Sequence, residues 1–137
     1  MEICFVNEDQ DDLDAERYIR LLVAVTKSDP DNGPPEYQYV KKQANSLGID
    51  IVPLWNDTSK HYLLEPIQVS RRVALVIIKD CIMLASLDGN FSLGEKEKVY
   101  RFAERLDVPR VDVDAVVSWL EDYERLQRRW HALTQRG

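Results

Sequence analysis

An internal repeat constrains the fold most, because the chain matches itself without a gap when it is shifted by 59 residues. Seven of 34 aligned pairs are identical, where about two are expected by chance for average composition. A duplicated unit of a helix, an Asp-containing turn and a second helix explains the match. The identical pairs are Ile19/Ile78, Asp29/Asp88, Glu36/Glu95, Val40/Val99, Ala44/Ala103, Leu47/Leu106 and Val52/Val111.

Apolar residues at helical spacing predict where the helices of each unit lie. The first unit is expected to form helices over residues 13–28 and 34–47, and the second over 66–87 and 93–106. The short apolar segment 49–55 is read as a helix in preference to a strand. Asp112 is expected to cap a last helix, whose apolar stripe over about six turns is formed by Val113, Val116, Val117, Leu120, Tyr123, Trp130 and Leu133.

Neither helical pair can cover its own apolar stripe, so the two units are expected to pack against each other. The predicted fold class is all-α: a bundle of about six helices built from two helix-turn-helix units related by a pseudo-two-fold axis. A chain of 137 residues with 45% apolar residues suits one domain with a real core. Residues 1–12 are expected to form an acidic N-terminal segment, and residues 13–137 the single helical domain.

The negative charge of the chain lies mainly at its beginning. The formal net charge is -6, and residues 1–16 hold seven acidic residues without a Lys or Arg. Nucleic acid is therefore not an expected partner, because phosphate backbones attract basic proteins. The acidic lead is read as a solvated tail and the first turn of a helix; an arm that binds a cation or a partner is the alternative.

Cys4 and Cys81 stand far apart and suggest no disulfide framework. The start of the chain lacks the features of a secretory signal, and the most apolar stretch, residues 73–87, is interrupted by Lys79 and Asp80 and is shorter than the roughly 20 residues of a membrane span. A cytoplasmic protein without a transmembrane segment is expected. Peripheral association with a membrane stays open.

The acidic turns of the two units are the candidate site. Neither turn forms an EF-hand: counted from Asp88, the positions that require Gly and a bidentate Glu hold Leu93 and Val99. Hard oxygen ligands could still bind calcium, magnesium or manganese, as two half-sites. The candidate metal ligands are Asp29, Asp31, Glu36, Asp88, Asn90 and Glu95.

The same residues also have a purely structural interpretation. Ser92 and Glu95 have the spacing of a capping box, in which the hydroxyl accepts from the Glu95 amide and the carboxylate reaches back to the Ser92 amide. Gly33 and Glu36 occupy the same frame in the first unit. Since Glu95 cannot commit fully to a cap and to a metal, cation binding is expected to alter the start of its helix.

No motif for a nucleophile, a phosphate loop or a zinc site is present, so no catalytic residues are assigned and the protein is not expected to be an enzyme. His61 and His131 have no neighbouring ligand partners and are read as surface or packing residues. The tryptophans, Trp55, Trp119 and Trp130, are interpreted as core or groove-lining residues.

The apolar helix that runs into Leu87-Asp88-Gly89, followed by Glu95 and by Ala103 to Leu106 in the next helix, resembles the TerB-like family, named for tellurite-resistance proteins. The resemblance covers about residues 18–134. It implies an all-helical domain that binds divalent metal through acidic residues near these turns, and a place in stress-response or tellurite-resistance systems. The first turn reads Asp29-Pro30 where the family pattern has Asp-Gly.

The sequence therefore predicts a non-catalytic TerB-like domain that binds a divalent cation and acts as a scaffold or stress-response module, with proteins as partners. The alternative is a protein-interaction domain that needs no metal.

Overall fold

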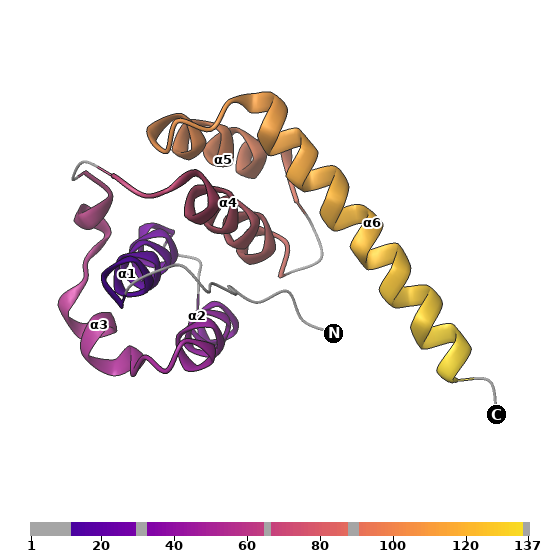
Figure 1. Ribbon diagram of the computed structural model, residues 1–137, viewed down its shortest axis with the longest axis horizontal. Helices are drawn as coiled ribbons and strands as arrows, with labels where there is room; N and C mark the ends of the chain where they lie inside the picture. Colours follow the sequence, from indigo (N-terminus) through magenta and orange to yellow (C-terminus); the bar gives the residue numbers. More distant parts are fainter. Residues whose placement is uncertain (1–11, 30–32, 65–66, 88–90, 136–137) are drawn as a thin grey trace.

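The computed structural model describes residues 12–29, 33–64, 67–87 and 91–135. Within these ranges the chain forms six α-helices, one short 3-10 helix and no strands, which confirms the predicted all-α fold of about six helices (Figure 1). The elements are α1 (Asp12–Ser28), α2 (Pro34–Ser46), α3 (Ile51–Asp57), η1 (Lys60–Leu64), α4 (Arg71–Ala85), α5 (Leu93–Arg105) and α6 (Arg110–Thr134).

The helix boundaries follow the internal repeat. A shift of 59 residues carries both ends of α2 onto the ends of α5, and the first residue of α3 onto the first residue of α6. The packing repeats as well: α1 contacts α2 and α3, as α4 contacts α5 and α6, and α1 packs on α4. Figure 1 shows α1 and α4 in the middle, with α2 and α3 on one side and α5 and α6 on the other. The duplicated unit thus comprises three helices.

The loops after α2 and α5 share one backbone conformation. Gly48 has φ +71° and its equivalent Asp107 has φ +58°, both in the left-handed region. The next residue donates in each case to a carbonyl in the last turn of the helix, Ile49 to Ala44 and Val108 to Ala103, both at 2.9 Å. This C-terminal cap satisfies carbonyls that would otherwise have no partner.

The core lies where α1 and α4 meet, and these two helices supply most of its fully buried side chains. The apolar side chains of these two helices that are at most 1% exposed are Tyr18, Ile19, Leu21, Leu22, Val23, Ala24, Val73, Ala74, Ile77 and Ile78. Both helices are therefore apolar around most of their circumference, as central helices of a bundle are.

A buried polar cluster joins α1, α2 and α4 inside this core. Asp80 is fully buried, and its two carboxylate oxygens accept from the hydroxyls of Tyr18 and Tyr39, the latter at 2.6 Å. The ammonium of Lys79, 6% exposed, lies 2.9 Å from the same carboxylate. A buried carboxylate is tolerated when its oxygens are satisfied in this way. The two residues that interrupt the apolar sequence of α4 thus hold three helices together.

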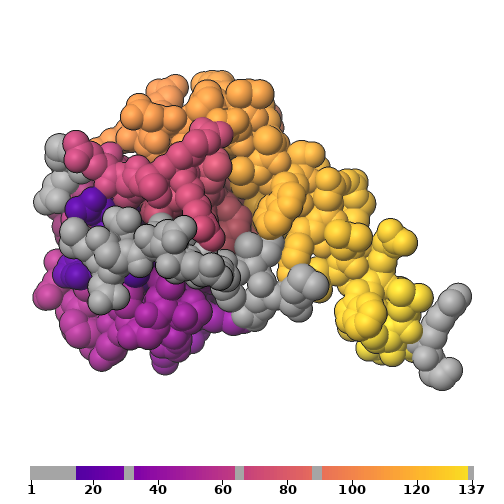
Figure 2. Space-filling view, viewed as in Figure 1, coloured from indigo at the N-terminus to yellow at the C-terminus, as the bar shows by residue number. Residues whose placement is uncertain are grey.

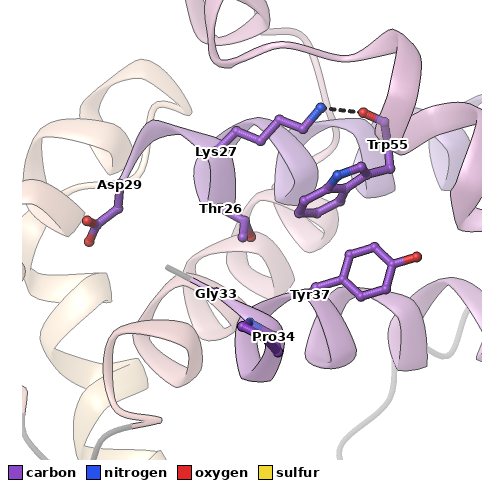
Figure 3. A pocket seen from close by; sticks show the side chains of 7 residues that line it. All are labelled: Thr26, Lys27, Asp29, Gly33, Pro34, Tyr37 and Trp55. Carbon is purple, nitrogen blue, oxygen red and sulfur yellow. Dashed lines mark hydrogen bonds between the residues drawn. The ribbon is translucent and has the colours of Figure 1, made fainter. Parts of the chain in front are cut away.

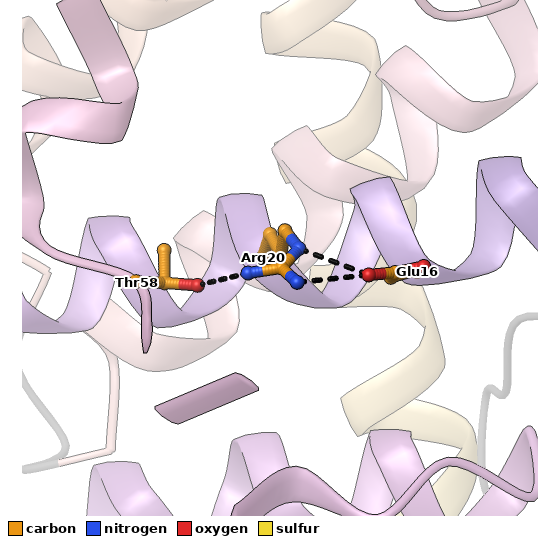
Figure 4. Close-up of polar contacts among 3 residues, drawn as sticks. All are labelled: Glu16, Arg20 and Thr58. Atoms are coloured by element: carbon orange, nitrogen blue, oxygen red, sulfur yellow. Dashed lines mark hydrogen bonds and ion pairs between the residues drawn. The ribbon is translucent and has the colours of Figure 1, made fainter. Parts of the chain in front are cut away.

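Arg20 ties α1 to the segment after α3 (Figure 4). Its guanidinium donates to the Glu16 carboxylate one turn earlier, at 2.9 and 3.1 Å, and to the Thr58 hydroxyl at 2.9 Å. Thr58 is buried, so this link fixes the end of α3 against α1.

Two boundaries differ from the sequence prediction. The predicted helix over 66–87 begins later, at Arg71, because the Ser70 hydroxyl caps it by accepting from the Val73 amide at 3.2 Å. The last helix begins earlier, at Arg110, because Pro109 has the extended backbone of an N-cap and its missing N–H costs nothing there. The predicted cap, Asp112, instead pairs with Arg71 at 2.9 Å.

The second half of α6 runs beyond the other helices, as Figures 1 and 2 show. Only Val113 and Leu120 of this helix are buried, whereas Trp119 is 49% and Trp130 66% exposed. The expectation that these two tryptophans lie in the core or in a groove is therefore wrong, because α6 is longer than the body against which it packs. Trp55 is half-buried, as expected.

Candidate functional site

Three of the six predicted ligands lie together. Asp29, Glu36 and Glu95 all line one pocket between the end of α1, the start of α2, the end of α4 and the start of α5. The other three, Asp31, Asp88 and Asn90, lie outside the described residues. The structure therefore brings acidic side chains of both hairpins to the lining of one pocket.

The pocket has a volume of about 610 Å³, which falls in the range of about 300–1,000 Å³ that is typical of ligand sites. Its polar lining consists of the three carboxylates with Ser28 and Lys98. Its apolar lining comes from α1, η1, α4 and α5 and comprises Val25, Leu63, Cys81, Leu84, Ala85, Val99 and Phe102. An apolar side chain can thus be buried here beside a net negative set of charges.

Two pairs of residues that are equivalent in the repeat line this one pocket. Val25 and Leu84 are equivalent under the 59-residue shift, and so are Glu36 and Glu95, yet all four line the same pocket. The pocket therefore lies where the first unit meets the second.

Helix capping positions the two glutamates. The Glu36 carboxylate accepts from the Gly33 amide at 2.9 Å at the start of α2. At the start of α5 the Ser92 hydroxyl accepts from the Glu95 amide at 3.2 Å and donates to the Glu95 carboxylate at 3.0 Å. The predicted capping frames are confirmed, with the difference that the Glu95 carboxylate takes its hydrogen bond from the hydroxyl. Both carboxylates also lie at the positive end of a helix dipole.

Cys81 places a thiol in the apolar wall of the pocket. Burial, and then the neighbouring Asp80 carboxylate, raise the pKa of this thiol well above its ordinary value. The thiol therefore stays protonated at neutral pH, and a protonated thiol is a poor nucleophile. In this pocket Cys81 contributes apolar surface.

The described residues contain no group of three or more His, Cys, Asp or Glu side chains close enough together to hold one metal ion. Asp29, Glu36 and Glu95 share the pocket lining, but they do not form a ready coordination cage. A cation at this mouth would need these side chains to move, or would keep much of its water, as magnesium commonly does.

A second cavity, of about 490 Å³, lies on the other side of Asp29 and is lined by Thr26, Lys27, Asp29, Gly33, Pro34, Tyr37 and Trp55 (Figure 3). The Lys27 ammonium lies 5.0 Å from the centre of the Trp55 ring and donates to the backbone carbonyls of Trp55 and Thr58. Tyr37 packs edge-on against the same ring, with the ring centres 4.8 Å apart. Lys27 thus caps the C-terminal end of α3.

The sequence pointed to the three carboxylates of the pocket but not to the rest of its lining, which includes Leu63, Lys98 and Phe102. Phe102 lies in the helix predicted over 93–106, but apolar spacing alone does not distinguish a pocket wall from a filled core. Leu63 lies in η1, which the apolar pattern did not predict. Both histidines are exposed, as predicted.

Comparison with protein-family models, curated proteins and solved structures gives no match for this chain. None of the described helices is both long and apolar enough to cross a membrane.

Proposed function

We propose that this domain is a non-catalytic docking module that binds a short protein segment in the pocket between the two hairpins. The observation that carries the proposal is the pairing of equivalent carboxylates, Glu36 and Glu95, at the mouth of one largely apolar pocket. The segment it suits presents an apolar side chain to the floor and a Lys or Arg to the carboxylates.

The chemistry of the lining supports binding over catalysis. The pocket offers carboxylates tied into helix caps, a protonated thiol and apolar walls. Rigid carboxylates held by their own helices are suited to attract a cationic group, because little conformational freedom is lost on binding. The single lysine, Lys98, lies on the same helix as Glu95 and sets the orientation of a bound segment.

A peptide selection tests the proposal. A library of random 12-residue peptides is selected on the full chain and on the double variant Glu36→Gln, Glu95→Gln. Glutamine also serves in a capping box, so both helices keep their starts while the charge is removed. The control is Glu104→Gln, an exposed glutamate of α5 outside the pocket.

We expect peptides with an apolar residue beside Lys or Arg to be enriched by the unchanged chain and by the control. The double variant is expected to lose this enrichment by about tenfold, since two interactions with a charged group are removed. Equal enrichment on all three proteins, or no enriched pattern, would show that this pocket is not a docking site.

Divalent cation binding is the second candidate, and the meeting of Asp29, Glu36 and Glu95 at one pocket favours it. Amide NMR during titration with magnesium, calcium and manganese tests it. Manganese should broaden the amides at the starts of α2 and α5 because it is paramagnetic, and magnesium or calcium should shift the same amides, since an occupied carboxylate gives up part of its cap. A spectrum that is unchanged at millimolar cation contradicts this candidate and leaves peptide docking intact.

The resemblance to the TerB-like family supplies the proposed setting, a cytoplasmic stress response such as tellurite resistance. Growth of the natural host without this gene, with and without tellurite, tests that setting. Equal growth of the two strains under tellurite would remove it.

A further inference from the structure

The free half of α6 carries an apolar seam. Trp119, Leu126, Trp130 and Leu133 are 49–66% exposed, and with Tyr123 they follow spacings of four, three, four and three residues. This alternation is that of the a and d positions of a coiled coil. The Trp119 ring stacks on Tyr123, with the ring centres 6.0 Å apart. Figure 2 shows this part of α6 standing out from the body.

Charge is distributed unevenly along the same helix. Before residue 125 the acidic residues are Asp112, Asp114, Glu121, Asp122 and Glu124, and from residue 125 onward the helix has only the basic Arg125, Arg128 and Arg129. Two such helices side by side in parallel would place like charges together. In antiparallel orientation the acidic part of one helix meets the basic part of the other.

We propose that a second copy of this chain pairs with α6 in antiparallel orientation along this seam. A register with Trp119 opposite Trp130 of the second copy also sets Tyr123 opposite Leu126 of the second copy, because both steps are four residues long. Each of the four layers from Trp119 to Trp130 then joins two apolar residues, while Leu133 falls opposite Val116, which packs on the core of its own chain. A heptad repeat makes such layers along its length.

The residues that flank the seam fit this register. Asp122 and Arg129 both precede an a position, so in the antiparallel pair Asp122 of each copy faces Arg129 of the other copy, and both ion pairs lie on the same side of the dimer. In a parallel pair Asp122 would face Gln127 of the second copy, and no ion pair would form. Asp122 now pairs with Arg125 on its own helix, where both are more than half exposed.

In this register the stretch from Trp119 to Trp130 pairs with the same stretch of the second copy over about 17 Å. It lies at the small end of stable interfaces, which bury at least about 1,200 Å², so the dimer is expected to be weak and dependent on concentration. Sedimentation equilibrium of the full chain from about 1 µM to about 1 mM covers the range in which such interfaces dissociate. The unchanged chain should pass from monomer to dimer in this range.

Four variants test the seam and its orientation. Leu126→Glu with Trp130→Glu should raise the dissociation constant at least about tenfold, because apolar layers are lost; both side chains are exposed, so folding is preserved. Asp122→Arg should raise it about fivefold, since two rim ion pairs become repulsive. Adding Arg129→Asp should restore it to within about twofold. Glu121→Arg, away from the seam, is the matched control and should change nothing.

Three results would overturn the proposal. A chain that stays monomeric at about 1 mM has no such interface. A dimer indifferent to Leu126→Glu with Trp130→Glu uses another surface. A dimer that the charge swap fails to restore is not antiparallel in this register. Deletion of residues 1–11 tests whether the acidic segment covers the seam in place of a second copy. If the chain is monomeric and its tryptophan emission shifts when this segment is deleted, the segment covers the seam and the proposal is wrong.

Discussion

Replacing Asp80 by alanine tests the buried cluster that joins α1, α2 and α4. Asp80 is fully buried and accepts from Tyr18 and Tyr39, while Lys79 lies 2.9 Å away. The substitution leaves the Lys79 ammonium without this counter-ion and the buried Tyr18 hydroxyl without its acceptor. We therefore expect the free energy of unfolding to fall far more than a small cavity alone would cause.

The magnitude follows from these two losses. Removing one partner of a buried ion pair costs about 3–5 kcal/mol, and the loss of the Tyr18 hydrogen bond to Asp80 adds about 1 kcal/mol. The two are not additive, because one carboxylate serves both, so the expected loss is about 5 kcal/mol. A chain of this length has roughly 7–20 kcal/mol of stability in total. The variant should fold, but with a much smaller margin.

Urea unfolding, followed by circular dichroism at 222 nm, measures this loss. With a slope of about 1.5 kcal/mol per molar urea, the midpoint should fall by about 3 M. Tyr18→Phe keeps the carboxylate satisfied by Tyr39 and Lys79 and should cost only about 1–2 kcal/mol. Glu104→Ala, on an exposed surface of α5, is the control and should cost less than about 0.5 kcal/mol. If Asp80→Ala lowers the free energy of unfolding by less than about 1 kcal/mol, the buried carboxylate does not hold the three helices together.

Three further predictions concern single groups. Burial and the Asp80 carboxylate raise the pKa of Tyr18. The neutral Tyr18 hydroxyl therefore stabilises the fold fully below about pH 10, and above that pH the free energy of unfolding should fall by up to about 1.4 kcal/mol per pH unit. Tyr18→Phe should flatten this slope in urea titrations at pH 9–11. Cys81 is buried and its pKa is raised. A disulfide reagent should therefore modify its thiol at pH 7 at least about 100-fold more slowly in the folded protein than in the protein unfolded by urea. Equal rates would show that the thiol is accessible to solvent in the folded protein. Asp107 has a left-handed backbone like that of Gly48, a conformation that favours glycine. Asp107→Gly should therefore raise the melting temperature by a few degrees and Gly48→Ala should lower it by a similar amount, corresponding to about 1 kcal/mol or less. A lower melting temperature for Asp107→Gly would contradict the repeated cap.

The sequence predicted the helices and the repeat because both depend on local spacing. A shift of 59 residues relates α2 to α5, and it relates Glu36 to Glu95 as well. Both glutamates belong to capping frames that span only four residues, so their positions can be predicted from local sequence. The pocket itself depends on how two hairpins pack, and this arrangement is set by contacts between distant parts of the chain.

Two features were hidden from sequence reasoning for a related reason. Asp80 and Lys79 were seen only as an interruption of an apolar run, because their partners, Tyr18 and Tyr39, lie on other helices. The apolar stripe of α6 was visible, but periodicity cannot tell a buried stripe from an exposed one. Only the lengths of the neighbouring helices show that Trp130 lies in solvent.

Amide NMR of the labelled full chain, titrated with the peptide that the selection enriches most, is the most direct test of the proposed docking pocket. We expect shifts concentrated at Val25, Leu84 and Phe102, and their loss in the variant Glu36→Gln, Glu95→Gln. Shifts that cluster on α6, or that persist without the two carboxylates, would contradict this proposal.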